Sequence, residues 1–155
     1  EGENLCCRQM LFKSASGDLR ADGNWEKLCT ETLSGDIDLS GQAVQLQAGT
    51  ASGDIQFSGA VQNVQADSAS GDLILECTTL PERAQLQSKS GDVELSVPDG
   101  AGFSLQYSVV SGDMESEFPL VGAVGGKSGS AVYLDGSGST FHLSSVSGDI
   151  ALRKN

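Results

Sequence analysis

The tripeptide Ser-Gly-Asp occurs seven times, and its Asp residues are the most regularly spaced side chains with chemical potential. Successive motifs begin 18, 18, 18, 20, 21 and 36 residues apart. Gly suits a turn that needs positive φ or a close approach of neighbouring backbone, while Ser and Asp oxygens accept hydrogen bonds from turn N–H groups. We therefore predict a structural turn ladder made by Asp18, Asp36, Asp54, Asp72, Asp92, Asp113 and Asp149.

Calcium binding is the competing interpretation of these carboxylates. Calcium-dependent nonapeptide rolls also use Gly and Asp turns with 18 residues per coil, but both turns of each coil carry ligands. Calcium takes about 6–8 oxygen ligands, which one Asp per unit hardly supplies. Asp36, Asp54 and Asp72 remain the weaker calcium candidates, and we expect no cofactor.

Catalytic constellations are weak. His142 is the single histidine and falls at an outward strand position. Sugar-cleaving sites need clustered carboxylates, often with Arg or Lys, yet no basic residue lies between Lys27 and Arg83. Among the eight aromatic residues, Trp25 and Tyr133 are the main ones available to stack on a sugar. We expect no enzymatic activity.

The elements that position the motifs are short strands with one buried face. Apolar and polar residues alternate before the tripeptides and after six of the seven, for example where Val44, Leu46 and Ala48 alternate with glutamines. Each unit therefore holds two strands and two turns. The residue after each Asp is apolar in all seven copies: Leu19, Ile37, Ile55, Leu73, Val93, Met114 and Ile150.

An all-β parallel β-solenoid explains the motif phase better than an antiparallel sandwich. A sandwich also spaces strands regularly but does not place the same tripeptide at the same phase in every unit. We expect about seven or eight coils of ~18 residues, right-handed by analogy with parallel crossovers; a left-handed helix is the alternative. The fold requires Ile37, Ile55 and Leu73 to lie on adjacent strands.

We expect one domain over residues 1–155, with an N-terminal cap at 1–13, regular coils at 14–127 and a final coil within 128–155. The long last interval predicts either a degenerate coil at Ser128-Gly129-Ser130 or a hairpin about Asp135-Gly136.

The four cysteines fit the same phase. Cys77 is predicted to point inward and Cys29 outward, so these two should not meet. Cys6 and Cys7 lie in the first coil, and either could reach Cys29, but the spacing specifies no disulfide bridge.

Prolines occur only in the three long intervals. The extra residues there should form loops along one corner of the rod, and such insertions often make the binding surface of a solenoid. Simple tolerance of loop length is the competing explanation. The candidate binding corner is Pro81, Glu82, Arg83, Pro98, Asp99 and Pro119.

Outward positions of the strand before each motif are rich in glutamine. Stacked Gln side chains form amide ladders along a sheet, which would give a flat, uncharged polar face. This face is either adhesive or simply self-stabilising. It contains Gln45, Gln47, Gln62, Gln65, Gln85, Gln87 and Gln106.

The net charge of −12 argues against nucleic-acid or anionic-membrane partners, because like charges repel. No stretch of 18 apolar residues occurs, so we expect no membrane insertion by this segment.

The series Ser-Gly-Asp-Ile/Leu/Val at 34–37, 52–55, 70–73 and 147–150 resembles bacterial putative-adhesin domains built from β-strand repeats. The similarity covers about residues 14–153, and the ending 145–150 resembles the close of such a domain. The resemblance implies an extracellular or cell-envelope location on bacteria, no known activity and no catalytic residues.

Three functional hypotheses follow. The first is a non-enzymatic surface module that binds a protein or a glycan. The second is a purely structural spacer or assembly element, and the least favoured is a carbohydrate-active enzyme. A binding screen with a loop-deleted control separates the first from the second.

Overall fold

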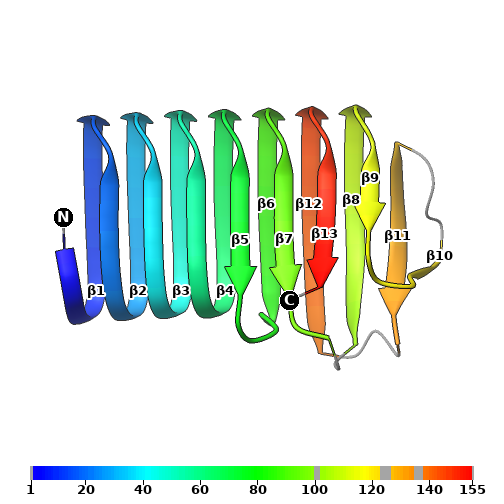
Figure 1. The fold of residues 1–155 in the computed structure, drawn as a ribbon, viewed down its shortest axis with the longest axis horizontal. Helices are drawn as coiled ribbons and strands as arrows, with labels where there is room; N and C mark the ends of the chain where they lie inside the picture. The colour runs from blue at the N-terminus through cyan, green and yellow to red at the C-terminus, as the bar shows by residue number, and fades with distance from the viewer. Residues whose placement is uncertain (1, 100–101, 123–126, 135–137, 155) are drawn as a thin grey trace.

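Strands stacked side by side form an all-β rod in the computed structural model (Figure 1). The structure describes residues 2–99, 102–122, 127–134 and 138–154, with side chains from residue 9 onward. Its strands are β1 (Gly2–Ser16), β2 (Leu19–Ser34), β3 (Ile37–Ser52), β4 (Ile55–Ser70), β5 (Leu73–Cys77), β6 (Arg83–Ser90), β7 (Val93–Val97), β8 (Phe103–Ser111), β9 (Met114–Ser116), β10 (Val121–Gly122), β11 (Ser128–Tyr133), β12 (Ser139–Ser147) and β13 (Ile150–Lys154).

Successive repeats pair in parallel and in register. Ile37 lies opposite Ile55, and Ile55 lies opposite Leu73. The predicted adjacency of these residues is confirmed, and so is the all-β class with a curled sheet of parallel strands. Identical turns at identical spacing allow this, because each strand meets its own copy one repeat later.

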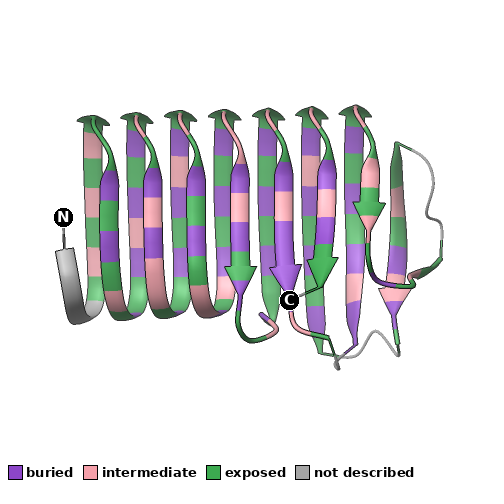
Figure 2. Ribbon diagram, in the orientation of Figure 1, coloured by how far each residue is buried: buried purple, intermediate pink, exposed green. Residues whose placement is uncertain are grey.

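The rod has two walls joined at the Ser-Gly-Asp turns, which form its upper edge in Figure 1. The post-turn wall contains the starts of β2–β4 together with β5, β7, β13 and β9. The pre-turn wall contains β1, the ends of β2–β4, and β6, β12, β8 and β11. Burial alternates along both walls (Figure 2), so the apolar core fills the space between them.

The alternation breaks once, at the second corner of the regular repeats. We predicted Val44 to be inward, but Val44 is 40 % exposed while Ala43 is buried. Two consecutive residues, Val44 and Gln45, point outward there because the chain bends between walls and the two-residue period restarts at Leu46.

The stacking order departs from chain order at the C-terminus. β12 pairs in parallel with both β6 and β8, and β13 pairs in parallel with both β7 and β9. The last repeat therefore lies between two earlier ones, as Figure 1 shows by the red strands inside the yellow-green region. The connection from Val97 to Phe103 therefore joins β7 to a strand, β8, that β12 separates from β6.

Both predictions for the long interval are wrong. Ser128-Gly129-Ser130 is no turn, because it lies within β11, which runs antiparallel to β8 and to β10. The strands that flank Asp135-Gly136, β11 and β12, lie on opposite sides of β8 and so form no hairpin; residues 135–137 themselves lie outside the described part. The antiparallel β10–β11 pair covers one end of the pre-turn wall.

The expected N-terminal cap is a strand in the regular register. β1 pairs with β2 in parallel, with Leu11 opposite Cys29 and Phe12 opposite Thr30. Residues 9–13 are therefore part of the stack. The described residues contain no helix of the length and apolarity needed to cross a membrane.

Candidate binding surface

The seven turns form a continuous hydrogen-bonded ladder. Along the stack, a carboxylate oxygen of each Asp accepts a hydrogen bond from the backbone N–H of the next Asp, at 2.8–3.1 Å. The Gly N–H donates to the Ser carbonyl of the neighbouring turn at 2.9–3.0 Å. The order of the ladder is Asp18, Asp36, Asp54, Asp72, Asp92, Asp149 and Asp113.

Each residue type in the motif has a physical reason. The turn glycines have φ between 109° and 141°, a region that L side chains rarely adopt. A Cβ on Gly53 would lie 2.2 Å from the carbonyl oxygen of Gly35. Asp supplies the acceptor that the next Asp N–H lacks at the corner, where no backbone carbonyl faces it.

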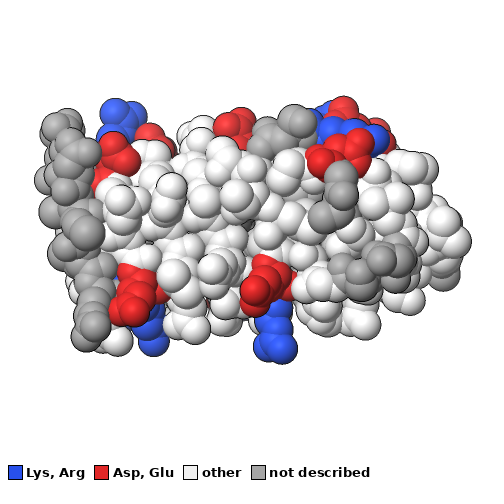
Figure 3. Space-filling model, turned by 90° about the horizontal axis from the view of Figure 1, so that it is seen from below, with Lys and Arg blue, Asp and Glu red and all other residues white. Residues whose placement is uncertain are grey.

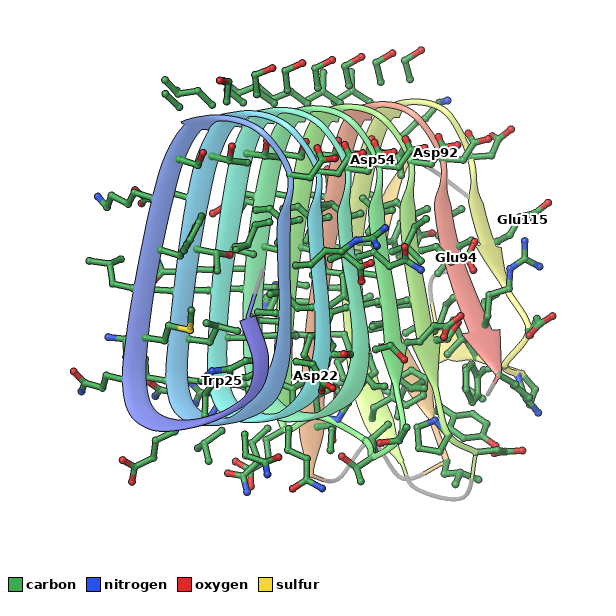
Figure 4. All side chains as sticks on the ribbon, turned by 60° about the vertical axis from the view of Figure 1, so that its left-hand side comes forward. Asp22, Trp25, Asp54, Asp92, Glu94 and Glu115 are labelled. Carbon is green, nitrogen blue, oxygen red and sulfur yellow. The ribbon has the colours of Figure 1, made fainter. Side chains whose placement is uncertain are left out.

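The column of carboxylates is visible along the turn edge, where Asp54 and Asp92 lie in one row (Figure 4). Six of the seven carboxylates have a following turn in the stack, and one oxygen of each accepts a hydrogen bond from the backbone of that turn. In the described part of the chain, no group of three or more His, Cys, Asp or Glu side chains could hold a metal ion. Asp36, Asp54 and Asp72 therefore stabilise the turns through hydrogen bonds to the backbone.

Lys127 terminates the ladder. Its ammonium donates a hydrogen bond to the carbonyl of Gly112 at 2.9 Å. Gly112 belongs to the last turn of the stack, where no further turn follows. A cation at this position also offsets the negative charge of the Asp column.

The loops after β5 and β7 lie at the edge opposite the turns, at the lower border of Figure 1, whereas Lys127, at the end of the third predicted insertion, lies at the turn edge beside Gly112. Their residues are largely structural. Pro81 is buried, and the backbone N–H and carbonyl of Glu82 bond to Gln62 and Thr140. Viewed onto this edge, most of the surface is uncharged, with charged side chains at its borders (Figure 3).

The remaining residues of the predicted corner divide between exposed and structural positions. The Glu82 and Arg83 side chains and Pro119 are exposed, and Pro98 is half-buried. Asp99 accepts a hydrogen bond from the Tyr133 hydroxyl and forms an ion pair with the Lys154 ammonium at 3.2 Å. The corner therefore offers a partner only scattered side chains.

An aromatic cluster fills the core near these loops. The Phe103 ring lies 4.8–5.3 Å from the rings of Phe118, Tyr133 and Phe141. Tyr133 is 6 % exposed, and its hydrogen bond to Asp99 raises the pKa of the phenol. The expectation that Tyr133 is available to stack on a sugar is wrong, because the ring packs in this cluster.

Trp25 is also unavailable. We expected an exposed ring, but Trp25 is 3 % exposed and belongs to the core. His142 points outward as predicted, with Gln85 and Gln106 as its Cα neighbours on adjacent strands.

The cysteines follow the predicted phase. Cys77 is buried and Cys29 is partly exposed. Burial raises the pKa of the Cys77 thiol to about 12. The backbone register places Leu11 opposite Cys29 and Cys7 opposite Trp25, four residues or ~13 Å apart along the strand. That separation exceeds disulfide reach.

The outward face of the pre-turn wall is a flat polar array, which we call the pre-turn face. One column across the strands contains Gln47, Gln65, Gln85, His142 and Gln106. All of these side chains are exposed. The predicted outward glutamines are confirmed in their position.

A groove crosses this face next to the turns, with a volume of about 960 Å³. Small outward side chains at Gly49, Ala51 and Ala69 make its floor, because nothing longer projects from three neighbouring positions. Leu33 and Val146 form part of its apolar wall, and their side chains are 64 % and 48 % exposed. The signal for this groove in the sequence is the run of Gly and Ala at outward phases, from which we predicted no site.

Charged groups mark the borders of the groove. At one end the Lys13 ammonium lies 2.8 Å from the Glu31 carboxylate, which neutralises both. Lys89 and Asp67 also line it, and partial burial raises the pKa of Asp67, while the Gln65 side chain opposes that shift. The groove is therefore mainly apolar with little net charge.

The opposite, post-turn face is acidic. Glu94 and Glu115 project from it in Figure 4, beside the Asp column. It offers mainly repulsion to any acidic partner. Its outward acidic residues are Asp22, Asp38, Glu76, Glu94, Glu115 and Glu117.

Comparisons with known proteins bear on this architecture. A family model described as "Toastrack DUF4097" matches residues 1–153, and no curated protein matches the chain. One similar solved structure is a "putative cell adhesion protein" from Clostridium sporogenes ATCC 15579. It has a TM-score of 0.52 and 10 % identity, and the alignment covers 96 % of this chain and 93 % of that one.

Proposed function

Because the chain belongs to the Toastrack DUF4097 family, whose fold is solenoid-like, we propose that it is a non-enzymatic binding module of the bacterial surface or envelope. The structural neighbour described as a "putative cell adhesion protein" supports a surface location. The groove on the pre-turn face is the observation that carries the proposal, and its ligand is a protein.

The choice of a protein over a glycan rests on the aromatic residues. All eight lie within the described side chains; seven are buried and Phe12 is half-buried. Sugar sites commonly present an exposed ring for stacking, whereas an apolar groove with exposed Leu and Val favours apolar protein side chains. The surrounding amides supply hydrogen bonds at the rim.

The proposal includes the finer architecture inferred from the repeat. The chain forms about seven or eight coils of ~18 residues with a right-handed path. Such a rod holds the groove rigidly, because every turn is bonded to the next. A rigid groove loses less conformational entropy when a partner binds.

The test is a screen of the protein against arrays of extracellular proteins and of glycans. The groove variant Ala51→Arg with Ala69→Arg fills the floor with long cations. The matched control, Gln56→Arg with Ser58→Arg, adds the same charge to exposed positions of the post-turn wall. We expect protein hits that the groove variant loses and the control keeps.

Glycan hits, or protein hits that survive in the groove variant, would overturn this assignment. A further variant, Glu82→Ala with Arg83→Ala, removes the exposed side chains of the loop corner. If only that variant loses binding, the partner binds at the loops and the groove plays no part.

A structural spacer is the second candidate, and the uninterrupted turn ladder favours it. A spacer binds nothing in either array and tolerates a change in repeat number. Enzymatic and calcium-dependent functions remain the least supported, since Asp residues of the turn bond to backbone.

A further inference from the structure

The C-terminal repeat, β12–β13, occupies an interior slot. Gly91 N–H donates to the Ser147 carbonyl at 2.9 Å, and Gly148 N–H donates to the Ser111 carbonyl at 3.0 Å. The repeat thus bonds to one neighbour on each side. Both neighbours precede the repeat in the chain, so residues 139–154 fill a slot whose two edges belong to earlier segments.

The packing of this repeat is entirely with segments distant in sequence. Phe141 and Ile150 are fully buried, and Leu143 and Leu152 are 2 % and 1 % exposed. β11, which precedes it, pairs with the far side of β8 and not with β12. The same repeat from a second copy of the chain would make the same contacts.

The end of the repeat is fixed by polar contacts that a second copy would also reproduce. The Lys154 N–H donates to Glu117 Oε2 at 2.7 Å, and its ammonium lies 5.3 Å from the Phe118 ring centroid. Arg153 pairs with Glu117 at 3.8 Å. These contacts join β13 to the segment after β9, which is again remote in sequence.

The connection to the repeat is short and begins at a strained residue. Tyr133 and Ser139 both lie opposite Phe103, on different sides of β8, so β8 separates the end of β11 from the start of β12. Leu134 has a φ of 57°, the one positive value at a non-glycine position in the described residues. Its side chain is 62 % exposed, so no packing offsets the strain of this left-handed conformation.

We propose that residues 139–154 exchange between two copies of this chain, giving a dimer in which each β12–β13 fills the slot of its partner. Exchange conserves every contact of the repeat and releases the left-handed conformation at Leu134. An extended connection from Tyr133 to Ser139 reaches roughly 20 Å, which suffices for two rods that meet at their loop edges. The proposal is independent of the ligand of the groove.

Co-refolding of two cysteine variants tests the exchange. Gln87 and Ser144 are Cα partners across β6 and β12. The Gln87 side chain is exposed, and the Ser144 side chain is half-buried. One variant contains Gln87→Cys and the other Ser144→Cys, each with Cys6, Cys7 and Cys29 changed to Ser. A disulfide between the two different chains forms only when β12 of one copy pairs with β6 of the other.

We expect the covalent heterodimer after the variants are unfolded and refolded together, and none when separately refolded proteins are mixed. Light scattering should show a dimer fraction that rises with protein concentration during refolding. A refolded mixture that stays monomeric at all concentrations, with no heterodimer, would overturn the proposal.

A hinge variant separates exchange from ordinary association. Leu134→Gly relieves the strain in the monomer and should lower the dimer-to-monomer ratio at least about fivefold, whereas Leu134→Val should raise it. Leu11, which is 64 % exposed in β1, gives the matched controls Leu11→Gly and Leu11→Val. Equal changes at both sites would contradict a role for the hinge.

Discussion

At the residue scale, the repeated tripeptide solves a local problem of backbone pairing. The Asp N–H at each corner has no carbonyl opposite it, and the carboxylate of the preceding turn provides the acceptor. Seven carboxylates are therefore stacked for structural reasons, although they raise the negative charge along one edge. Asp residues whose repetition in the sequence suggests catalysis or metal binding instead stabilise the turns.

The ladder predicts the effect of removing one carboxylate. Asp54→Ala leaves the Asp72 N–H without its acceptor, which lies at 2.9 Å, and should lower the free energy of unfolding by about 1 kcal/mol. Asp54→Asn retains an acceptor and should cost less. Chemical denaturation measures both, with Asp22→Ala, outside the ladder, as the control; equal losses at Asp54 and Asp22 would contradict the ladder.

Two glycines of one repeat, Gly49 in β3 and Gly53 in the turn after it, make a matched pair. Gly53→Ala forces a Cβ to 2.2 Å from the Gly35 carbonyl oxygen at a φ of 135° and should destabilise the fold by more than about 2 kcal/mol. At Gly49 the nearest atom, the Asp67 carbonyl oxygen, is 3.9 Å away. Gly49→Ala should therefore change stability by no more than ~0.5 kcal/mol. Thermal unfolding of both variants checks the contrast.

The buried thiol of Cys77 predicts a loss of stability in alkali. Its folded pKa, about 12, lies above the ordinary thiol value of 9.0 because burial disfavours the thiolate. The contribution is fully present below pH 9 and is lost as the pH rises towards 12, since only the unfolded chain then releases the proton. Denaturation across this range should show a smaller loss for Cys77→Ala; parallel curves would exclude the thiol as the cause.

At the element scale, the last repeat is held by intersegment packing and not by its place in the chain. The rings of Phe103, Phe118, Tyr133 and Phe141 come from four separate segments. Phe141 joins the other three rings only when β12–β13 lies between β6–β7 and β8–β9. The aromatic cluster therefore couples the inserted repeat to the loops on both sides.

This coupling makes Phe103 a sensitive position. Phe103→Ala removes contacts with three rings and should lower the free energy of unfolding by about 3–5 kcal/mol. Val121, 72 % exposed, is the control, and Val121→Ala should stay within ~0.5 kcal/mol. Urea denaturation compares the two, and a loss below ~1 kcal/mol at Phe103 would contradict a packed cluster.

At the scale of the whole molecule, the regular repeats are equivalent layers of the rod, because each pairs with the next in the same register. Deletion of residues 37–54 joins Asp36 to Ile55 and removes one 18-residue register step. The shortened protein should fold, with a rod shorter by ~4.8 Å, as small-angle scattering can measure. Deletion of residues 37–45, half a step, moves Ser52, Gly53 and Asp54 to the second corner, away from the turn ladder, and should abolish cooperative unfolding. Folding of both deletions would show that register does not matter.

The two faces of the rod differ in a way that concerns partners. The post-turn face and turn edge hold most of the acidic side chains, while the pre-turn face presents amides, hydroxyls and the apolar groove. An acidic partner meets either a repulsive or a nearly neutral surface, depending on the side that it approaches. The proposed groove lies on the neutral side.

The sequence by itself determined the parallel repeat, the phase of the buried residues after each turn and the stacking of the turns, because these depend on local alternation and on spacing. Ile37, Ile55 and Leu73 had to be neighbours once each unit repeated after 18 residues. Only the tertiary structure decided that Asp149 lies between Asp92 and Asp113, that Trp25 and Tyr133 are buried, and that small residues line up into a groove. Those features depend on which distant segments pack together, and the spacing within one repeat does not specify the free energy of that packing.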